Sequence, residues 1–343
     1  MATVKDVARE AGVSLGTVSN VLNGKGSVKE ANREKVWEAV KKLGFHYNMT
    51  ASALRTKSTK NIGLIIPTII NPYYPELARG VEDEARKEGF TVFLCNSDRQ
   101  EEKERTYINA LVSKGVDGII LVKPRIEKEE LRKLGERTSL VVQDWDTDSW
   151  DGFPGVNVND YVGIVQGMNL LFRYGHRRIA FIGGLMESYS SRRRLMAYEN
   201  CLEAQGIPYR PEYVILGDYS GSSGYEAAKK LLKLEQMPTA IIASNDMMAM
   251  GAMKAIQAKG LQIPGDISVI GYDDIEMSRL CTPSLTTIHQ PKYEAGVAAF
   301  KLLRQSISGE EIPGEKRHVL LETRMIERDS AGYAPVHISE KGG

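Results

Sequence analysis

Thr17 and Asn20 are the first residues of the chain whose types and spacing indicate a chemical task. They lie three positions apart in the segment TVKDVAREAGVSLGTVSNVLN (residues 3–23), so on a helix they share one face. An asparagine amide can bond the edge of adenine, and apolar groups contact the methyl group of thymine. Thr17 and Asn20, with Leu15, are therefore predicted to read base edges in a major groove.

The apolar residues around this face predict the elements that must present it. Two short helices are expected, with inward faces formed by Val4, Val7, Ala8 and Ala11 in the first and by Val18, Val21 and Leu22 in the second. Gly12 permits a tight turn between them, and Ser14 can cap the second helix. One helix is then braced and the other presented, as a helix-turn-helix requires.

A third helix is expected from about Lys29 to Leu43, opened by a capping box that starts at Ser27 and closed by Gly44. Val36, Val40 and Leu43 supply its inward face. Three helices would then enclose one small core of about 45 residues, which is enough to present a recognition helix.

From residue 61 onward the pattern alternates between apolar strands and amphipathic helices, which is typical of parallel α/β sheets. Strands are predicted at 61–66, 91–95, 118–122, 140–144, 179–184, 213–217, 240–244 and 267–274. Helices are predicted at about 75–88, 101–113, 159–173, up to 204, up to 234, and at 246–259. The two halves repeat a similar order of elements, so two doubly wound subdomains are expected side by side.

Polar and aromatic segments lie close to the ends of these strands. They are NPYY (71–74), NSD (96–98), QDWD (143–146), SSRRR (190–194), SND (244–246) and GYDD (271–274). Ligands of open α/β sheets bind at the carboxyl ends of the strands, so a cleft between the two subdomains is the expected ligand site. Carboxylates, amides and an aromatic platform suit a sugar, while an arginine and stacked rings would also suit a purine.

The segments DVAREAGVS and TVSNVLN carry a specific resemblance to the LacI/GalR family of bacterial transcription regulators. The resemblance implies an all-α helix-turn-helix headpiece followed by an α/β core like that of periplasmic binding proteins, with two doubly wound parallel-sheet subdomains. The expected divisions are a headpiece (1–45), a hinge helix and linker (46–60), an effector-binding and dimerisation domain (61–330) and a flexible tail (331–343). The chain should cross between subdomains near 160, 289 and 322, giving a first subdomain of 61–159 and 290–321 and a second of 160–289 and 322–330; the helix at about 291–307 returns to the first.

DNA contacts follow from the helix-turn-helix and from the resemblance. Phosphate contacts are expected from Lys5, Ser14, Ser19 and Lys25, whereas Gly16 offers no side chain where relatives often read a base. The resemblance implies a hinge helix that ends near Arg55, pairs across a dimer, and inserts Leu54 into the minor groove. We assign Arg55 to the DNA contacts as well; a cap of the linker helix is the structural alternative for Leu54.

Effector contacts come from the resemblance, residue by residue. It places them on Tyr73, Tyr74, Arg194, Asn245 and Asp273, with Asp144 and Asp160 as further candidates. Structural roles remain open for several of them: Asn245 can cap the helix that starts at Asp246, and Asp273 can belong to a turn. The family usually has aspartate then asparagine at the crossover, whereas this chain has Asn159 then Asp160.

The distribution of charged residues agrees with a DNA-binding N-terminal segment and an effector-binding body. Residues 1–60 contain eleven lysines and arginines against five acidic residues, and the rest of the chain contains 34 against 39. A basic N-terminal segment suits a DNA phosphate backbone. The three cysteines, Cys95, Cys201 and Cys281, are far apart and predict buried thiols rather than a disulfide framework or a zinc site. No signal peptide or membrane span is expected, which predicts a cytoplasmic protein.

The sequence therefore predicts a homodimeric transcription repressor on a palindromic double-stranded operator, controlled by a small effector, most simply a sugar. Three alternatives stay open. The same regulator could use a phosphorylated carrier protein as corepressor, since ELARGVED and NSD also match such relatives. The second alternative is a sugar-binding protein without DNA function, which the basic headpiece disfavours. An enzyme is disfavoured because no Gly-rich nucleotide motif, GxSxG or metal spacing occurs; His289 is expected in a crossover strand, and no cofactor or metal is expected.

Overall fold

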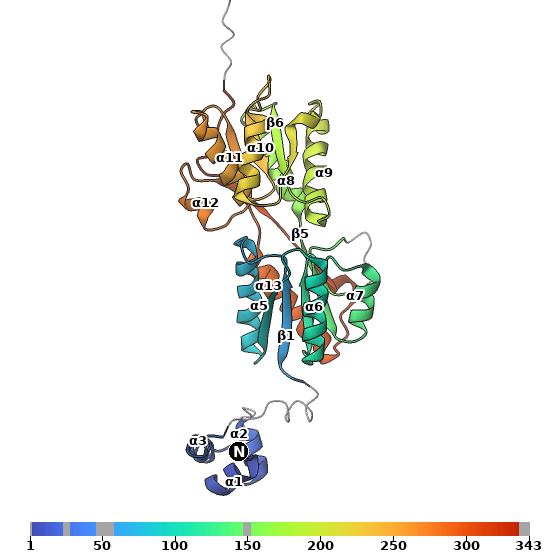
Figure 1. Ribbon diagram of the computed structural model, residues 1–343, viewed down its shortest axis with the longest axis vertical. Coiled ribbons are helices and arrows are strands. Elements are labelled where there is room, and N and C mark those ends of the chain that lie inside the picture. The colour runs from blue at the N-terminus through green and yellow to red at the C-terminus, as the bar shows by residue number, and fades with distance from the viewer. Residues whose placement is uncertain (1, 23–27, 46–57, 147–151, 336–343) are drawn as a thin grey trace, which may run out of the picture. The chain divides into compact units, whose positions relative to one another are not determined.

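The chain divides into two compact units, a helical headpiece (Met1–Thr59) and a larger α/β body (Lys60–Gly343) (Figure 1). The computed structural model describes residues 2–22, 28–45, 58–146 and 152–335. The predicted hinge helix and its residues Leu54 and Arg55 lie outside the described residues, and so does Lys25.

The headpiece contains α1 (Val4–Ala11), α2 (Leu15–Leu22) and α3 (Glu30–Leu43). Their apolar faces form one core from Val7, Ala8, Ala11, Val18, Val21, Val36, Ala39 and Phe45. Gly44 ends α3 in the left-handed conformation, as predicted. The predicted capping box is wrong, because Lys29 is the N-cap and makes no side-chain capping bond. Ser27 lies outside the described residues.

The first subdomain of the body is built on a six-stranded parallel sheet in the order β11-β5-β4-β3-β1-β2. The strands are β1 (Asn61–Ile66), β2 (Thr91–Asn96), β3 (Gly118–Val122), β4 (Ser139–Gln143), β5 (Gly155–Val158) and β11 (His318–Leu321). The helices α5 (Tyr73–Lys87) and α13 (Lys292–Ser308) share a core with one face, and α6 (Glu101–Ser113) and α7 (Lys128–Gly135) share a core with the other. Strands covered on both faces account for the continuous apolar runs NIGLII and GIILV.

The second subdomain repeats this plan with the strand order β12-β10-β9-β8-β6-β7, in which only β12 is antiparallel to its neighbour. Its strands are β6 (Ile179–Gly183), β7 (Val214–Leu216), β8 (Ala240–Ala243), β9 (Ser268–Asp273), β10 (Thr286–His289) and β12 (Arg324–Ile326). One face carries α10 (Gly221–Leu231) and α11 (Asp246–Ala258), and the other carries α8 (Asp160–Arg173) and α9 (Tyr189–Ala204). The short elements are α12 (Met277–Leu280), η2 (Pro211–Tyr213) and η3 (Gly314–Lys316).

The chain passes between the sheets three times: after β5, after β10 and between β11 and β12. Two of these crossings are hydrogen-bonded together. The Asn159 amide N–H donates to the carbonyl of Leu321 over 2.8 Å, and the Thr323 hydroxyl donates to the carbonyl of Asn159 over 3.3 Å. At the remaining crossing, after β10, the buried ammonium of Lys292 donates to the carbonyl of Asp273 over 2.6 Å. The connection between subdomains is therefore a bonded hinge rather than a loose linker.

The helix pair α5 and α13 joins chain segments about two hundred residues apart on one face of the first sheet (Figure 1). Their backbones approach so closely that a Cβ atom on Gly80 would lie 2.1 Å from the carbonyl oxygen of Tyr293. A side chain at this position would force the two helices apart, and interiors packed to this density do not absorb such a shift. The close packing of α5 against α13 therefore requires glycine at position 80.

Several local expectations need correction. The sequence reasoning missed α7 and the strands β5, β11 and β12 because their apolar runs are short. Of the three cysteines only Cys201 is buried, while Cys95 and Cys281 are partly exposed. Part of the expected flexible tail is packed: the Ala334 N–H donates to the carbonyl of Tyr174 over 2.8 Å, and the buried His176 ring contacts the Gly332 carbonyl at 2.9 Å. The tail residues contact partners that are distant in the sequence, so no local sequence pattern predicts these contacts.

Candidate functional site

The recognition surface of the headpiece is held by capping interactions at the starts of both helices. Thr3 and Asp6 form a capping box on α1, with the Asp6 carboxylate accepting the Thr3 N–H over 2.9 Å. These hydrogen bonds from Thr3 lower the pKa of Asp6. Gly12 then ends α1 with φ near +62°, and the Ser14 hydroxyl accepts the N–H of Thr17 over 3.1 Å to cap α2.

The outward face of α2 carries the residues expected to contact DNA. Leu15 is 47% exposed, Gly16 is also exposed, and Thr17, Ser19 and Asn20 are half-buried. Lys5 on α1 is exposed too. Their neighbours Val18 and Val21 are buried in the headpiece core, so α2 cannot roll to hide this face. The Thr17 hydroxyl lies 2.9 Å from the Ser14 hydroxyl, and this hydrogen bond orients both side chains.

In the body, the seven residues expected to contact an effector come together around one small cavity between the two sheets. Tyr73, Tyr74, Asp144, Asp160, Arg194, Asn245 and Asp273 all line it. The free volume is only about 20 Å³, because the side chains fill the space with bonds to one another. The sequence reasoning therefore identified residues that are neighbours in space, although they span two hundred positions in the chain.

Arg194 lies at the centre of these bonds and is only 3% exposed. Its Nε donates to the Asp160 carboxylate over 2.8 Å, and its Nη1 donates to the carbonyl of Ser244 at the end of β8. The Arg194 guanidinium also lies over the Tyr272 ring, 3.7 Å from its centroid. Burial raises the pKa of Asp160, and the neighbouring Arg194 charge offsets only part of that rise.

The order Asn159 then Asp160 has a structural consequence. Asn159 is the N-cap of α8 and accepts the Val162 N–H over 3.4 Å, so Asp160 becomes the first residue of the helix. A carboxylate is favoured there by the positive end of the helix dipole. From this position Asp160 accepts the Arg194 hydrogen bond.

A second ion pair lies within the first subdomain, and its lysine reaches across the cleft to the second. The Lys123 ammonium, just after β3, lies 2.7 Å from the Asp144 carboxylate and donates to the Ser190 hydroxyl of α9 over 2.9 Å. Burial tends to raise the pKa of Asp144, but the Lys123 charge and hydrogen bond bring that pKa below its ordinary value. Lys123 and Asp144 both have positive φ angles, 52° and 56°, which aim their side chains into the cleft.

Asn245 and Asp273 have structural bonds as well as places in the cleft. The Asn245 side-chain oxygen caps α11 by accepting the Met248 N–H over 2.9 Å, and its amide nitrogen donates to the carbonyl of Tyr219. Asp273 accepts from the Gln290 amide over 2.6 Å. Burial raises the pKa of Asp273 to about 6, and the charges of Arg194 and Lys292 limit that rise.

The two tyrosines lie in the first turn of α5, earlier than the predicted start of the helix at position 75. Their rings meet edge to face with centroids 5.1 Å apart. Tyr73 faces the small cavity, where its hydroxyl lies 3.4 Å from the Gln143 side-chain nitrogen. The other amide atom of Gln143 is buried without a hydrogen-bond partner in the described residues, which leaves one polar group available to a ligand.

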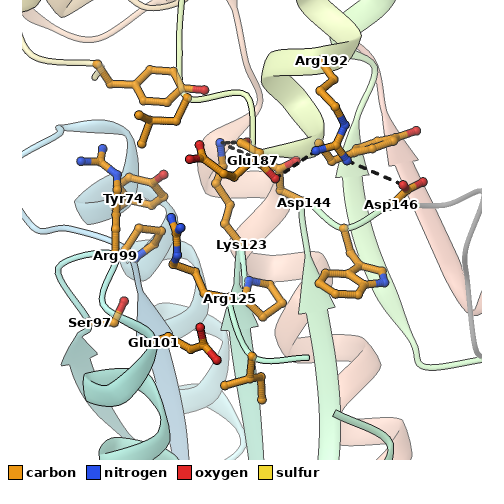
Figure 2. A pocket seen from close by; sticks show the side chains of 18 residues that line it. Tyr74, Ser97, Arg99, Glu101, Lys123, Arg125, Asp144, Asp146, Glu187 and Arg192 are labelled. Carbon is orange, nitrogen blue, oxygen red and sulfur yellow. Dashed lines mark hydrogen bonds and ion pairs between the residues drawn. The ribbon is translucent and has the colours of Figure 1, made fainter. Parts of the chain in front are cut away.

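A larger cavity of about 370 Å³ adjoins the small one and shares Tyr74, Lys123, Asp144 and Tyr219 with it (Figure 2). This volume lies in the range of small-molecule sites. The sequence reasoning named neither Lys123, Arg125, Gln143 nor Tyr219 as ligand contacts. Gln143 belongs to the segment QDWD, which the strand-end rule had selected, and Lys123 and Arg125 follow β3, to whose end the same rule applies. No local signal marks Tyr219.

His289, considered as a catalytic base, lines neither cavity. It is the last residue of β10, as the crossover strand expectation requires, and its ring lies 2.9 Å from the Asp274 carboxylate. Arg328 contacts the same carboxylate. This network ties β9, β10 and the segment after β12 together and gives His289 a structural role.

Known proteins with this combination of units are regulators. A model of bacterial regulatory proteins of the lacI family matches residues 3–48, and a model of a periplasmic binding protein-like domain matches residues 168–331. Catabolite control protein A of Priestia megaterium is 37% identical over 311 residues, which cover 90% of this chain and 94% of that protein.

Solved structures agree with both units. The lac repressor dimer bound to operator and the anti-inducer ONPF is 29% identical with a TM-score of 0.84, covering 96% of this chain and 99% of that one. The complex of the transcriptional regulator CelR with cellobiose is 29% identical with a TM-score of 0.73, covering 96% and 100%. The fold and the cleft thus define a ligand-responsive DNA-binding regulator. The chain belongs to the LacI family of bacterial transcription regulators.

Within the described ranges, none of the helices has the length and apolar character needed to cross a membrane.

Asn20→Ala is expected to relax base discrimination by roughly 1 to 3 kcal/mol per half-site, because an asparagine amide can bond the edge of adenine and alanine cannot. Operator variants changed one base at a time, titrated by fluorescence anisotropy, measure this. Lys5→Ala is the matched control and should weaken all variants alike, since a phosphate contact carries no sequence information. Unchanged discrimination in Asn20→Ala contradicts the assignment.

Asp273→Asn is expected to remove a pH dependence of stability. The pKa of Asp273 is raised from an ordinary 3.8 to about 6. Between these two pH values Asp273 is protonated in the folded protein and ionised in the unfolded chain. The free energy of unfolding of the wild type therefore falls as pH rises from 4 through 6. The difference amounts to roughly 3 kcal/mol. Urea unfolding of both proteins at pH 4 to 7 measures it, and parallel stability curves contradict it.

Proposed function

We propose that this regulator binds a palindromic operator as a homodimer and that a sugar, or a sugar derivative, in the cleft controls its affinity for DNA. The observation that carries the effector proposal is the set of carboxylates, amides, Arg194 and tyrosines gathered where the strand ends of the two sheets meet. Carboxylate and amide groups bind adjacent hydroxyls, and a tyrosine face packs against the apolar side of a sugar ring. The relative CelR, solved with cellobiose, supports the same class of ligand.

Control of DNA affinity follows from contacts that span the cleft. Lys123 of the first subdomain bonds Ser190 of the second, and Lys292 bonds the Asp273 carbonyl across the hinge. A ligand that inserts between these groups replaces some of the bonds and keeps others, so it favours one arrangement of the two subdomains over another. Only such unequal binding can move the equilibrium, and typical coupling of 1 to 3 kcal/mol changes affinity about 5- to 150-fold.

Two copies are needed because one headpiece reads only a half-site. The edge strand β2 offers a surface for the second copy. Phe93 and Leu94 on this strand are 39% and 50% exposed, and Ile69 and Ile70 in the loop after β1 are 55% and 82% exposed. Ile69 and Leu94 line one surface hollow. Exposed apolar side chains at a sheet edge are typical of a protein interface, and a second copy of this chain is the occupant we propose.

The relatives are transcription regulators rather than enzymes, and we infer the same for this chain. Its place of action is then the bacterial cytoplasm, where the operator lies. Leu54 and Arg55 are proposed to contact the minor groove, as the resemblance implies; both lie outside the described residues.

The operator, selected from random DNA with the purified protein, allows the effector proposal to be tested. At least one sugar in a panel of mono- and disaccharides should change the operator Kd of the wild type about 5- to 150-fold. Asn245→Ser keeps an N-cap on α11 but removes the amide, so it should need at least about tenfold more sugar for the same response. Asn200→Ser, on the exposed side of α9, is the control.

The outcomes separate the claims. If no sugar acts on the wild type, the sugar proposal fails while DNA binding stands, and purines or a phosphorylated carrier protein become the candidates. If Asn245→Ser responds like the wild type, Asn245 is only a helix cap.

Leu94→Glu is expected to convert the dimer into a monomer, because it places a charge in the apolar surface proposed as the interface. Sedimentation velocity at micromolar concentration measures the mass. The exposed Leu216 on β7, at the edge of the other sheet, provides the control variant Leu216→Glu. A dimer that survives Leu94→Glu shows that the two copies meet elsewhere.

A further inference from the structure

The larger cavity contains four basic and four acidic side chains, and their pairing leaves the charges unevenly distributed. The basic residues are Arg99, Lys123, Arg125 and Arg192, and the acidic residues are Glu101, Asp144, Asp146 and Glu187. With equal numbers of basic and acidic residues, the cavity has no net formal charge. Which charges are already paired therefore decides what a ligand meets.

Three of the four acids are engaged. Lys123 lies 2.7 Å from Asp144, and Arg192 lies 3.7 Å from Asp146. Glu101 pairs over 2.5 Å with Arg105, which does not line the cavity. Glu187 comes from the loop before α9 in the second subdomain, and Figure 2 shows it beside the tip of Lys123.

Arg99 and Arg125 are the cations left over. They come from successive strand-end loops of the first subdomain, after β2 and after β3, and Figure 2 shows both guanidinium groups in the cavity on the side of Tyr74. Among the described residues, no carboxylate lies within ion-pair distance of either. Arg99 lies 5.7 Å from the centroid of the Tyr219 ring, which is an interaction that leaves its N–H groups free to donate.

The backbones of both arginines are held in place. The Arg99 N–H donates to the carbonyl of Pro67 over 3.1 Å, and its φ of 57° is a conformation that non-glycine residues adopt only when the surroundings impose it. The carboxylate of Glu104, 2% exposed on α6, accepts the N–H of Arg125 over 2.9 Å and that of Ile126 over 3.1 Å. A buried carboxylate used to fix a loop indicates that the position of Arg125 matters.

We propose that the effector carries an anionic group, a phosphate monoester or a carboxylate, which Arg99 and Arg125 bind together. Planar guanidinium groups donate paired hydrogen bonds that match the oxygens of both anions. The rest of the effector then lies toward Tyr74 and the small cavity, where carboxylates and amides meet hydroxyls. This inference rests on the proposed control by a small ligand in the cleft and narrows it to an acidic sugar derivative.

The test uses the simple anions, so that the sugar need not be known. The melting temperature of the full-length protein is measured with increasing inorganic phosphate or acetate, at constant ionic strength adjusted with chloride. Binding to the folded state stabilises it by RT ln(1 + [L]/Kd), so the melting temperature keeps rising with the concentration of an anion that binds. Phosphate or acetate should stabilise the wild type beyond chloride, and the stronger of the two identifies the anionic group.

The double variant Arg99→Gln, Arg125→Gln should bind the preferred anion at least about tenfold more weakly, because it loses charge-assisted hydrogen bonds. Arg99→Lys with Arg125→Lys keeps the charge without the paired donors and should be intermediate, which also serves if the glutamine variant is poorly folded. Arg132→Gln, on the exposed surface of α7, is the matched control and should respond like the wild type.

Absence of any anion effect in the wild type overturns the inference, and so does an effect that survives in the double variant. Neutral sugars are measured in the same series. If they stabilise the protein while anions do not, the anion subsite is refuted and the proposed sugar control stands.

Discussion

The buried guanidinium of Arg194 is the constraint on which the cleft depends. A buried charge is tolerated only if it is paired and its hydrogen bonds are met, and here Asp160 and the Ser244 carbonyl meet them. These partners come from the start of α8 and the end of β8, so the arginine ties a crossing of the chain to the centre of the second sheet. Removing either partner would leave a buried charge without compensation, which makes the set of contacts cooperative.

That set of contacts explains how a ligand in the cleft could change the arrangement of the two subdomains. The subdomains are connected by bonded crossings, where Asn159 meets Leu321 and Lys292 meets Asp273, and by the cleft pair Lys123 and Asp144 with Ser190. Polar groups whose hydrogen bonds are satisfied by one another hold the two subdomains in one defined arrangement rather than in a continuous range of arrangements. A ligand that offers alternative partners changes which arrangement is stable, and this is the physical content of two-state control.

Much of the architecture was predictable because the signals are local. Buried parallel strands read as apolar runs, helix ends are marked by Gly44 and by the Asn245 cap, and the strand-end rule leads to the segments around Tyr74, Asp144 and Asp273. Three of the errors share one cause. Strand β5, helix α7 and the packed segment around Gly332 are stabilised by partners distant in sequence, and their own short patterns do not distinguish them from loops.

By itself the sequence determined the headpiece with its exposed reading face, the alternation of strands and helices, and the identity of the polar residues at strand ends, because each depends on neighbours within a turn or a strand. Only the tertiary structure decided how these polar groups are shared. It showed that Arg194 and Lys123 are paired, that Asn245 both caps a helix and lines the cleft, and that Arg99 and Arg125 lack acidic partners among the described residues. Charge pairing depends on distances of a few ångströms between remote segments, and such distances exist only once the chain has folded.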